Sequence, residues 1–210
     1  NLTRNAVIRS KNPALSHRGH VMFMHTKDVQ IHNAAFEDLG RTNKLVTVND
    51  PVIDQDGQLV PGSGTNPRGR YALHFHRPGV ENDGSPAVVR GSVVHNSPGW
   101  GFVNHSGFVD FEDNVAFNVD GAAFVTEAGN EIGSFRRNLA IRSVGSGEDK
   151  TYSRQNEQDF GHQGDGFWFQ GLGVAVEDNI AVGHAGHGFI SWTRGLVEPD
   201  LQISGDDHDR

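Results

Sequence analysis

Histidine and carboxylate side chains at regular spacing are the residues of this sequence most able to do chemistry. His74 and His76 form a His-x-His pair, His105 follows, and Glu127 stands 22 residues after His105. Three neutral imidazoles and a carboxylate are good ligands for Zn, Fe, Mn or Cu. The same groups also exchange protons near neutral pH, with the carboxylate orienting a histidine or sharing its proton. A third interpretation is a solvated polar ladder with no chemical role, and all three stay open on sequence alone.

Short apolar segments must position these side chains. Six segments share a large apolar residue at the second position: 21–25, 72–76, 101–105, 123–127, 166–170 and 188–192. Alternation along a strand sends the third and the fifth residue outward if the second points inward. The fifth positions read His25, His76, His105, Glu127, Gln170 and Trp192, and the third positions read Phe23, His74, Val103, Val125, Trp168 and Ile190. The predicted metal ligands are therefore His25, His74, His76, His105 and Glu127.

A second repeated unit precedes these segments and indicates the fold. It begins at Asn5, Asn33, Ser92, Asn114, Asn138 and Asn179, and five of the six copies have a glycine seven residues later. Three short strands and three turns fit a repeat of 22 residues, and no helical periodicity is sustained. The pattern predicts an all-β fold, a right-handed parallel β-helix of about six coils stacked about 4.8 Å apart. Stacked asparagines would form a side-chain amide ladder. A β-sandwich of short strands is the alternative, but it does not explain the repeat.

Two copies carry long insertions, at about 41–70 and 146–165. Both fall between the turn glycine and the second segment, so both loops leave the solenoid at the same edge, where binding sites are commonly built. Asp165 closes the second loop and joins Glu127, His105 and His76 as a candidate acid or base. Asp159, within that loop, is expected to face solvent.

Aromatic and basic residues on the same face suggest the substrate. Exposed rings of Trp168, Trp192 and Phe23 would stack on sugar rings along an extended polymer. Arg41, Arg70 and Arg77 come from loops near the histidines and would pair with substrate carboxylates.

Composition excludes several other classes of function. The 210 residues carry a formal charge of −8, which disfavours binding to nucleic acid or anionic lipid through net charge. The absence of cysteine removes disulfides and thiolate ligands. No apolar run is long enough for membrane insertion, and the first residues lack a signal-peptide profile.

Several longer motifs carry a family resemblance. They span residues 18–25, 39–42, 70–76, 99–106, 113–116 and 121–131. In these motifs the chain resembles the β-helical region of the cell-surface hyaluronidase family, which includes the cell migration-inducing, hyaluronan-binding protein, its transmembrane relative and bacterial homologues. The resemblance implies an extracellular or cell-surface β-helix that takes part in depolymerising hyaluronan or a related glycan.

The resemblance and the residues together lead to one expectation with two alternatives. We expect a single β-helix domain over 1–210 that cleaves an extended, hyaluronan-like polysaccharide at the His/Glu site with a bound Zn, Cu, Fe, Mn or Ca ion. The alternatives are a non-catalytic glycan-binding module and a His-ligated metal enzyme that acts on glycans by redox chemistry. Hydrolysis and elimination are not distinguished. Because the chain begins inside a coil, we expect a piece of a longer protein whose solenoid ends are capped by a flanking domain or a second copy.

Overall fold

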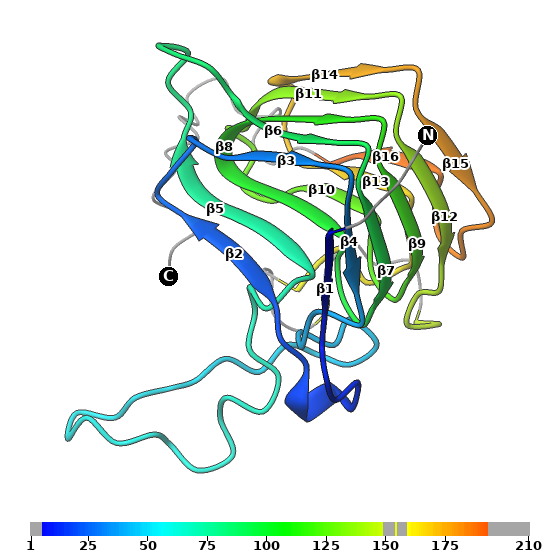
Figure 1. The fold of residues 1–210 in the computed structure, drawn as a ribbon. Helices are drawn as coiled ribbons and strands as arrows, with labels where there is room; N and C mark the ends of the chain where they lie inside the picture. The colour runs from blue at the N-terminus through cyan, green and yellow to red at the C-terminus, as the bar shows by residue number, and fades with distance from the viewer. Residues whose placement is uncertain (1–5, 149–153, 155–158, 193–210) are drawn as a thin grey trace.

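The chain is a parallel β-helix, as the repeat predicts (Figure 1). The structure is a computed structural model that describes residues 6–148, 154 and 159–192. Along the chain the strands visit three sheets in a fixed order, so that each coil gives one strand to each sheet. The paired strands are parallel throughout the described coils. Within the described residues, the only helical element is the short 3-10 helix η1 (Leu15–His17).

The strands divide among the three sheets as follows. The first sheet contains β1 (Ala6–Arg9), β4 (Ala34–Glu37), β7 (Val93–Ser97), β9 (Val115–Val119), β12 (Leu139–Ser143) and β15 (Ile180–Val182). The second contains β2 (Val21–Met24), β5 (Leu73–Gly79), the first part of β8 (Phe102–Glu112), β10 (Phe124–Thr126), β13 (Phe167–Phe169) and β16 (Phe189–Ser191). The third contains β3 (Gln30–His32), β6 (Ala87–Arg90), the second part of β8, β11 (Ile132–Arg136) and β14 (Val174–Glu177).

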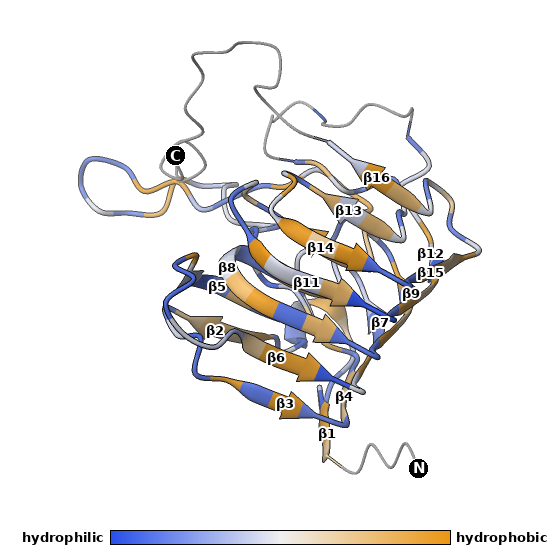
Figure 2. Ribbon diagram, turned by 90° about the horizontal axis from the view of Figure 1, so that it is seen from above, coloured by the Kyte–Doolittle hydropathy of each residue, from blue (hydrophilic) through white to orange (hydrophobic). Residues whose placement is uncertain are grey.

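The second and third sheets meet at a corner that β8 crosses without a break. Its first part pairs with β5 and β10, and its second part pairs with β6 and β11. Figure 2 shows the strands of the third sheet stacked one above another, each with apolar and polar segments. The alternation reflects the two faces of each strand, one toward the core and one toward solvent.

Aromatic rings stacked one per coil fill the interior behind the second sheet. The rings of Phe102, Phe124, Phe167 and Phe189 stack with centroids 4.8, 4.8 and 4.7 Å apart. Their strands pair in register at these positions, so the ring spacing follows the spacing of the coils. The repeated large apolar position therefore points inward, as predicted.

The predicted asparagine ladder is present at the start of the first sheet. Asn114 Nδ2 donates to Asn138 Oδ1 at 3.1 Å, and Asn138 Nδ2 donates to Asn179 Oδ1 at 3.0 Å. Asn114 Oδ1 also accepts the backbone N–H of Ser92, which replaces asparagine in its copy of the repeat. These hydrogen bonds link the side-chain amides of successive coils, which keeps the turns in register.

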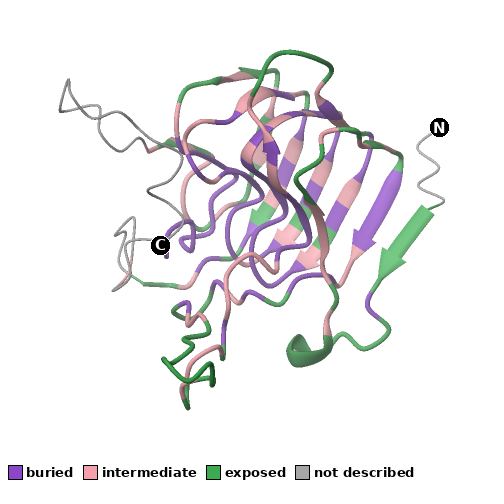
Figure 3. Cartoon of the chain, turned by 90° about the vertical axis from the view of Figure 1, so that its left-hand side faces the viewer, coloured by how far each residue is buried: buried purple, intermediate pink, exposed green. Residues whose placement is uncertain are grey.

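The two long insertions leave the solenoid at the same corner. One joins β4 to β5 and the other joins β12 to β13. The first projects from the body and ends in a small antiparallel pairing between Ile53 and Leu59 (Figure 1). Figure 3 shows exposed residues at η1, along β1 and at the tip of this projection.

Candidate functional site

Three histidines and a glutamate meet on the outer face of the second sheet. Each of His74, His76 and His105 offers a ring nitrogen, and these atoms lie within 4.8 Å of one another. Glu127 Oε2 is 3.5 Å from His74 Nε2 and 3.3 Å from His105 Nδ1. The residues that the 22-residue spacing aligns are therefore neighbours in space.

Strand register explains how they meet. His74 and His76 alternate with interior residues on β5, and His76 pairs with His105 on β8. Glu127 follows β10 directly, and its backbone N–H bonds to the carbonyl of Asn104 at 2.9 Å, which continues the row into the next coil. One side chain from each of three successive coils therefore lies in the same row.

Four side-chain atoms that could bind a metal are buried in this cluster and have no hydrogen-bond partner outside it. They are His74 Nε2, His76 Nδ1, His105 Nδ1 and Glu127 Oε2. The Glu127 side chain is only 15% exposed, and that of His74 is 1% exposed. Apart from the contacts of Glu127 with His74 and His105, these atoms have no polar partner among the described residues. Buried polar atoms without hydrogen bonds are costly, so their grouping indicates a ligand that the site is built to hold.

The other ring nitrogen of His74 is held by the backbone. His74 Nδ1 lies 3.1 Å from the carbonyl oxygen of Gly69, to which only a protonated nitrogen can donate. This contact places a proton on Nδ1 and directs Nε2 at the cluster. A backbone carbonyl that orients a ring in this way is usual for histidines that bind metals.

Electrostatics set different protonation states within the cluster. Burial, His105 and His74 lower the pKa of His76 to about 4, so this ring is neutral at neutral pH. Burial opposes ionisation of Glu127, but His105 and His74 outweigh it and hold its pKa well below the usual value. Burial likewise acts against the charge on His105, but Glu127 prevails and raises the pKa of His105. The carboxylate is therefore ionised beside one neutral and one more basic imidazole.

A second buried carboxylate holds the turns that carry these residues. Glu131 Oε1 accepts the backbone N–H groups of Ser106, Glu127 and Ala128 at 3.1, 3.0 and 2.6 Å, and Oε2 accepts that of Gly129 at 2.7 Å. Ser106 directly follows His105, so one side chain ties the His105 turn to the Glu127 turn. The contacts of Glu131 are therefore those of a structural acceptor.

The first coil differs from the prediction by one residue. Val21 pairs with Leu73 and Met24 pairs with His76, so the predicted outward positions of Phe23 and His25 are wrong. Phe23 pairs with Phe75 and packs against the core. His25 is exposed and has a positive φ of 55°. It lies outside the group of three histidines whose ring nitrogens converge.

The predicted aromatic platform is also wrong. Trp168 does point away from the β-helix interior, but it is fully buried, because Phe160 of the second long loop stacks on it with centroids 5.5 Å apart. Trp192 is half-buried against the same two rings, at 5.5 and 5.7 Å. The loop covers the face that the sequence pattern leaves open.

Asp165 lies at the opposite end of the strand row. Its backbone carbonyl accepts the N–H of Ala123, just before β10, whereas Glu127 follows that strand. The buried Asp165 carboxylate contacts His187 Nδ1 at 3.1 Å. The structure therefore does not bring Asp165 to the histidine cluster.

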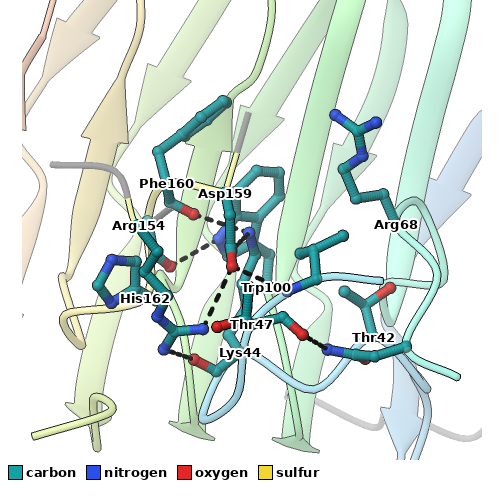
Figure 4. A network of polar contacts seen from close by, with 12 residues as sticks. Thr42, Lys44, Thr47, Arg68, Trp100, Arg154, Asp159, Phe160 and His162 are labelled. Carbon is teal, nitrogen blue, oxygen red and sulfur yellow. Dashed lines mark hydrogen bonds and ion pairs between the residues drawn. The ribbon is translucent and has the colours of Figure 1, made fainter. Parts of the chain in front are cut away.

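A buried ion-pair network fastens the two long loops together (Figure 4). Lys44 Nζ donates to Asp159 Oδ1 at 3.2 Å and to the carbonyl of Phe160 at 2.8 Å, and it lies 4.4 Å from the ring centre of Trp100. Arg154 donates to Asp159 and to the carbonyl of Lys44. Both side chains of the Lys44–Asp159 pair are fully buried, and burial lowers the pKa of Lys44. The expectation that Asp159 faces solvent is wrong.

Sequence reasoning did not find this network. Lys44 and Asp159 are separated by 115 residues and lie outside the repeat, so no local pattern links them. The one available signal is the position of both insertions at the same edge, which predicts that the loops meet but not through which residues.

The fold and the site define a class: a parallel β-helix with a histidine-rich site on one outer face. A sequence model of the family described as CEMIP beta-helix matches residues 61–194, more than half of the chain, and the chain belongs to this hyaluronidase-like family. The matched region includes His74, His76, His105 and Glu127. Searches of curated proteins and of solved structures found no match. Among the described residues, no helix is long and apolar enough to span a bilayer.

Proposed function

We propose that this chain is a carbohydrate-active enzyme that cleaves an extended polysaccharide at the cluster of His74, His76, His105 and Glu127. The single observation that carries the proposal is the grouping of four buried polar atoms that have no hydrogen-bond partner outside the cluster. Family membership supports a glycan such as hyaluronan as substrate and an extracellular or cell-surface location.

The donor set fits a transition metal. His74, His76 and His105 supply three nitrogens, and Glu127 supplies one oxygen beside two of them. Nitrogen-rich sites suit Zn, Cu, Fe or Mn, whereas Ca prefers oxygen ligands. When bound, such an ion would polarise a substrate oxygen or activate water.

The protein residues have distinct roles in this proposal. Glu127 is ionised at neutral pH because His105 and His74 outweigh burial and lower its pKa, so it accepts a proton. The pKa of His105 is raised by Glu127 against the effect of burial, so this ring is the better donor. Without a bound ion, Glu127 and His105 would therefore act as a base and an acid side by side. Glu131 keeps the two turns in place and is itself buried.

Elemental analysis together with turnover tests the proposal. We expect about one transition metal per chain and turnover on a panel of acidic and neutral glycans, both lost in His76→Ala. His95→Ala is the matched control, because His95 is an exposed histidine on β7 of another sheet. Ultraviolet absorption by an unsaturated product would identify elimination. Turnover that requires an added reductant would identify redox cleavage.

Two results would change the proposal. Turnover that survives complete removal of metal would favour metal-free catalysis by Glu127 and His105. Absence of turnover on every glycan would refute the enzyme. The glycan-binding module loses its support, since Phe23 packs against the core and Trp168 is buried.

A further inference from the structure

A pocket of about 590 Å³ opens between η1 and the base of the first long loop. The residues that line it include the apolar Leu15 and Val46 and the basic Arg41 and Arg70. No acidic residue lines it. The pocket therefore combines a positive charge with an apolar surface.

Among the described residues, neither arginine of this pocket has an acidic partner. In the part of the chain that the structure describes, no carboxylate lies within ion-pair distance of Arg41 or Arg70. Nearby Arg68 differs, because its Nε donates to Asp50 Oδ2 at 2.5 Å. Two guanidinium groups without an acid, next to an arginine that has one, indicate that the missing anion comes from a ligand.

The backbone fixes the two arginines relative to each other. The N–H of Arg41 donates to the carbonyl of Arg70 at 2.7 Å. The Thr42 hydroxyl donates to the carbonyl of Pro67 at 2.8 Å and accepts the N–H of Arg70 at 2.9 Å. The pocket is therefore built on the rigid base of the loop and not on its projecting tip.

The pocket adjoins the proposed catalytic cluster. Arg70 follows Gly69, whose carbonyl accepts the ring N–H of His74 at 3.1 Å. His20 lies close to both sites: burial and then the charges of Arg70, Arg41 and His74 lower its pKa. A ligand that fills the pocket would therefore extend toward the histidines.

We propose that Arg41 and Arg70 form a subsite for a carboxylate-bearing sugar, a uronate, of the polysaccharide that the enzyme cleaves. The inference rests on the proposed function for the identity of the ligand. A planar guanidinium matches a carboxylate with two parallel hydrogen bonds, and the apolar wall suits the C–H face of the ring. The net charge of −8 repels a polyanion, and the positive charges of Arg41 and Arg70 offset this repulsion locally.

Calorimetric titration of the full chain with oligosaccharides tests this subsite. The chain carries Glu127→Gln so that binding is measured without cleavage. The probes are a hyaluronan hexasaccharide, the same hexasaccharide with its carboxylates reduced to alcohols, and a sulfated glycan without carboxylates. We expect the acidic hexasaccharide to bind about tenfold to a hundredfold more tightly than the reduced one. Arg41→Gln/Arg70→Gln should abolish this difference and leave the affinity for the reduced hexasaccharide unchanged.

Two further variants separate recognition from charge and folding. Arg41→Lys/Arg70→Lys keeps both charges but loses bidentate geometry, so it should retain only part of the preference. Arg136→Gln/Arg137→Gln removes the same two charges at the end of β11, where acidic side chains already pair with them, and should keep the preference in full.

Each outcome decides the subsite separately from the enzyme. Equal affinity for the acidic and reduced probes, or a preference that survives Arg41→Gln/Arg70→Gln, would overturn it. Equally tight, arginine-dependent binding of the sulfated glycan would overturn the carboxylate assignment. If the chain without Glu127→Gln has no turnover but the arginine-dependent preference is present, the subsite stands and the enzyme proposal fails.

Discussion

Replacing Glu131 by glutamine should destabilise the fold by about 2 to 4 kcal/mol. The carboxylate is 1% exposed and accepts four backbone N–H groups, three at Oε1 and one at Oε2. Glutamine keeps one oxygen, but its NH₂ group meets the N–H of Gly129 and cannot accept it. One charge-assisted bond worth about 1.5 to 3 kcal/mol is lost, and the remaining three become neutral and weaker.

Urea unfolding followed by tryptophan fluorescence measures this loss, because Trp100 and Trp168 are buried. The transition midpoint should fall while the m-value stays constant, which shows that stability and not compactness has changed. Glu177→Gln is the matched control: its exposed carboxylate pairs with Arg136 at the surface and should contribute about 1 kcal/mol or less.

The same variant should also weaken metal binding, because Glu131 holds the turns that carry His105 and Glu127. A Glu131→Gln chain whose stability lies within about 0.5 kcal/mol of the original would refute the assignment of these four bonds. A destabilised chain with unchanged metal affinity would show that Glu131 stabilises the fold without positioning the site.

Four other predictions follow from particular contacts. Asp159→Ala leaves the Lys44 ammonium buried without its partner and should cost about 3 to 5 kcal/mol in urea unfolding. Asn138→Ala breaks the amide ladder in both directions and should cost about 2 to 4 kcal/mol by the same assay. With metal removed by a chelator, the free energy of unfolding should fall as the pH drops from about 6.5 to 4, because His76 takes up a proton in the unfolded chain but not in the folded one. His76→Ala should make this dependence of stability on pH less steep. His25→Ala should leave the metal content unchanged by elemental analysis, because His25 lies outside the cluster.

Each of these predictions has a contradicting result. An Asp159→Ala chain of unchanged stability would mean that the two loops are held elsewhere. An Asn138→Ala chain with an unchanged urea midpoint would show that the amide ladder is a consequence of coil stacking and does not stabilise it. A pH slope identical with and without the His76 imidazole would place the proton uptake on another group. Loss of metal in His25→Ala would support the strand register predicted from the sequence, in which His25 is a ligand.

The fold was predictable because the solenoid repeats its chemistry. An inward aromatic position recurs in register, and the Phe102, Phe124 and Phe167 rings stack as a result. Asparagines recur at the turn that begins the first-sheet strand, where each amide bonds to the next coil. In a parallel β-helix, positions one repeat apart are neighbours in space, so sequence spacing translates directly into contact.

The positions of the candidate site residues were predicted correctly wherever the alignment of the repeats gave the correct strand register. His105 and Glu127 are 22 residues apart and adjacent in space, as the repeat requires. The first coil departs from it because its apolar residues are consecutive: Val21, Met22 and Phe23 each fit the large position, and composition does not choose among them. The positive φ values do, since His25 shares its left-handed backbone with Arg77, the residue after His76.

Insertions account for the remaining errors, and for a physical reason. A loop that leaves the repeat carries no register, so its contacts depend on partners distant in sequence, such as Lys44 with Asp159. These contacts also decide what the repeat exposes. Trp168 occupies an outward position of its strand, but Phe160 and the loop above it exclude solvent. Beside this buried aromatic layer, the end of the first loop contacts the histidine cluster through Gly69 and carries Arg70 of the arginine pocket, so the insertions themselves define which part of the sheet can meet a substrate.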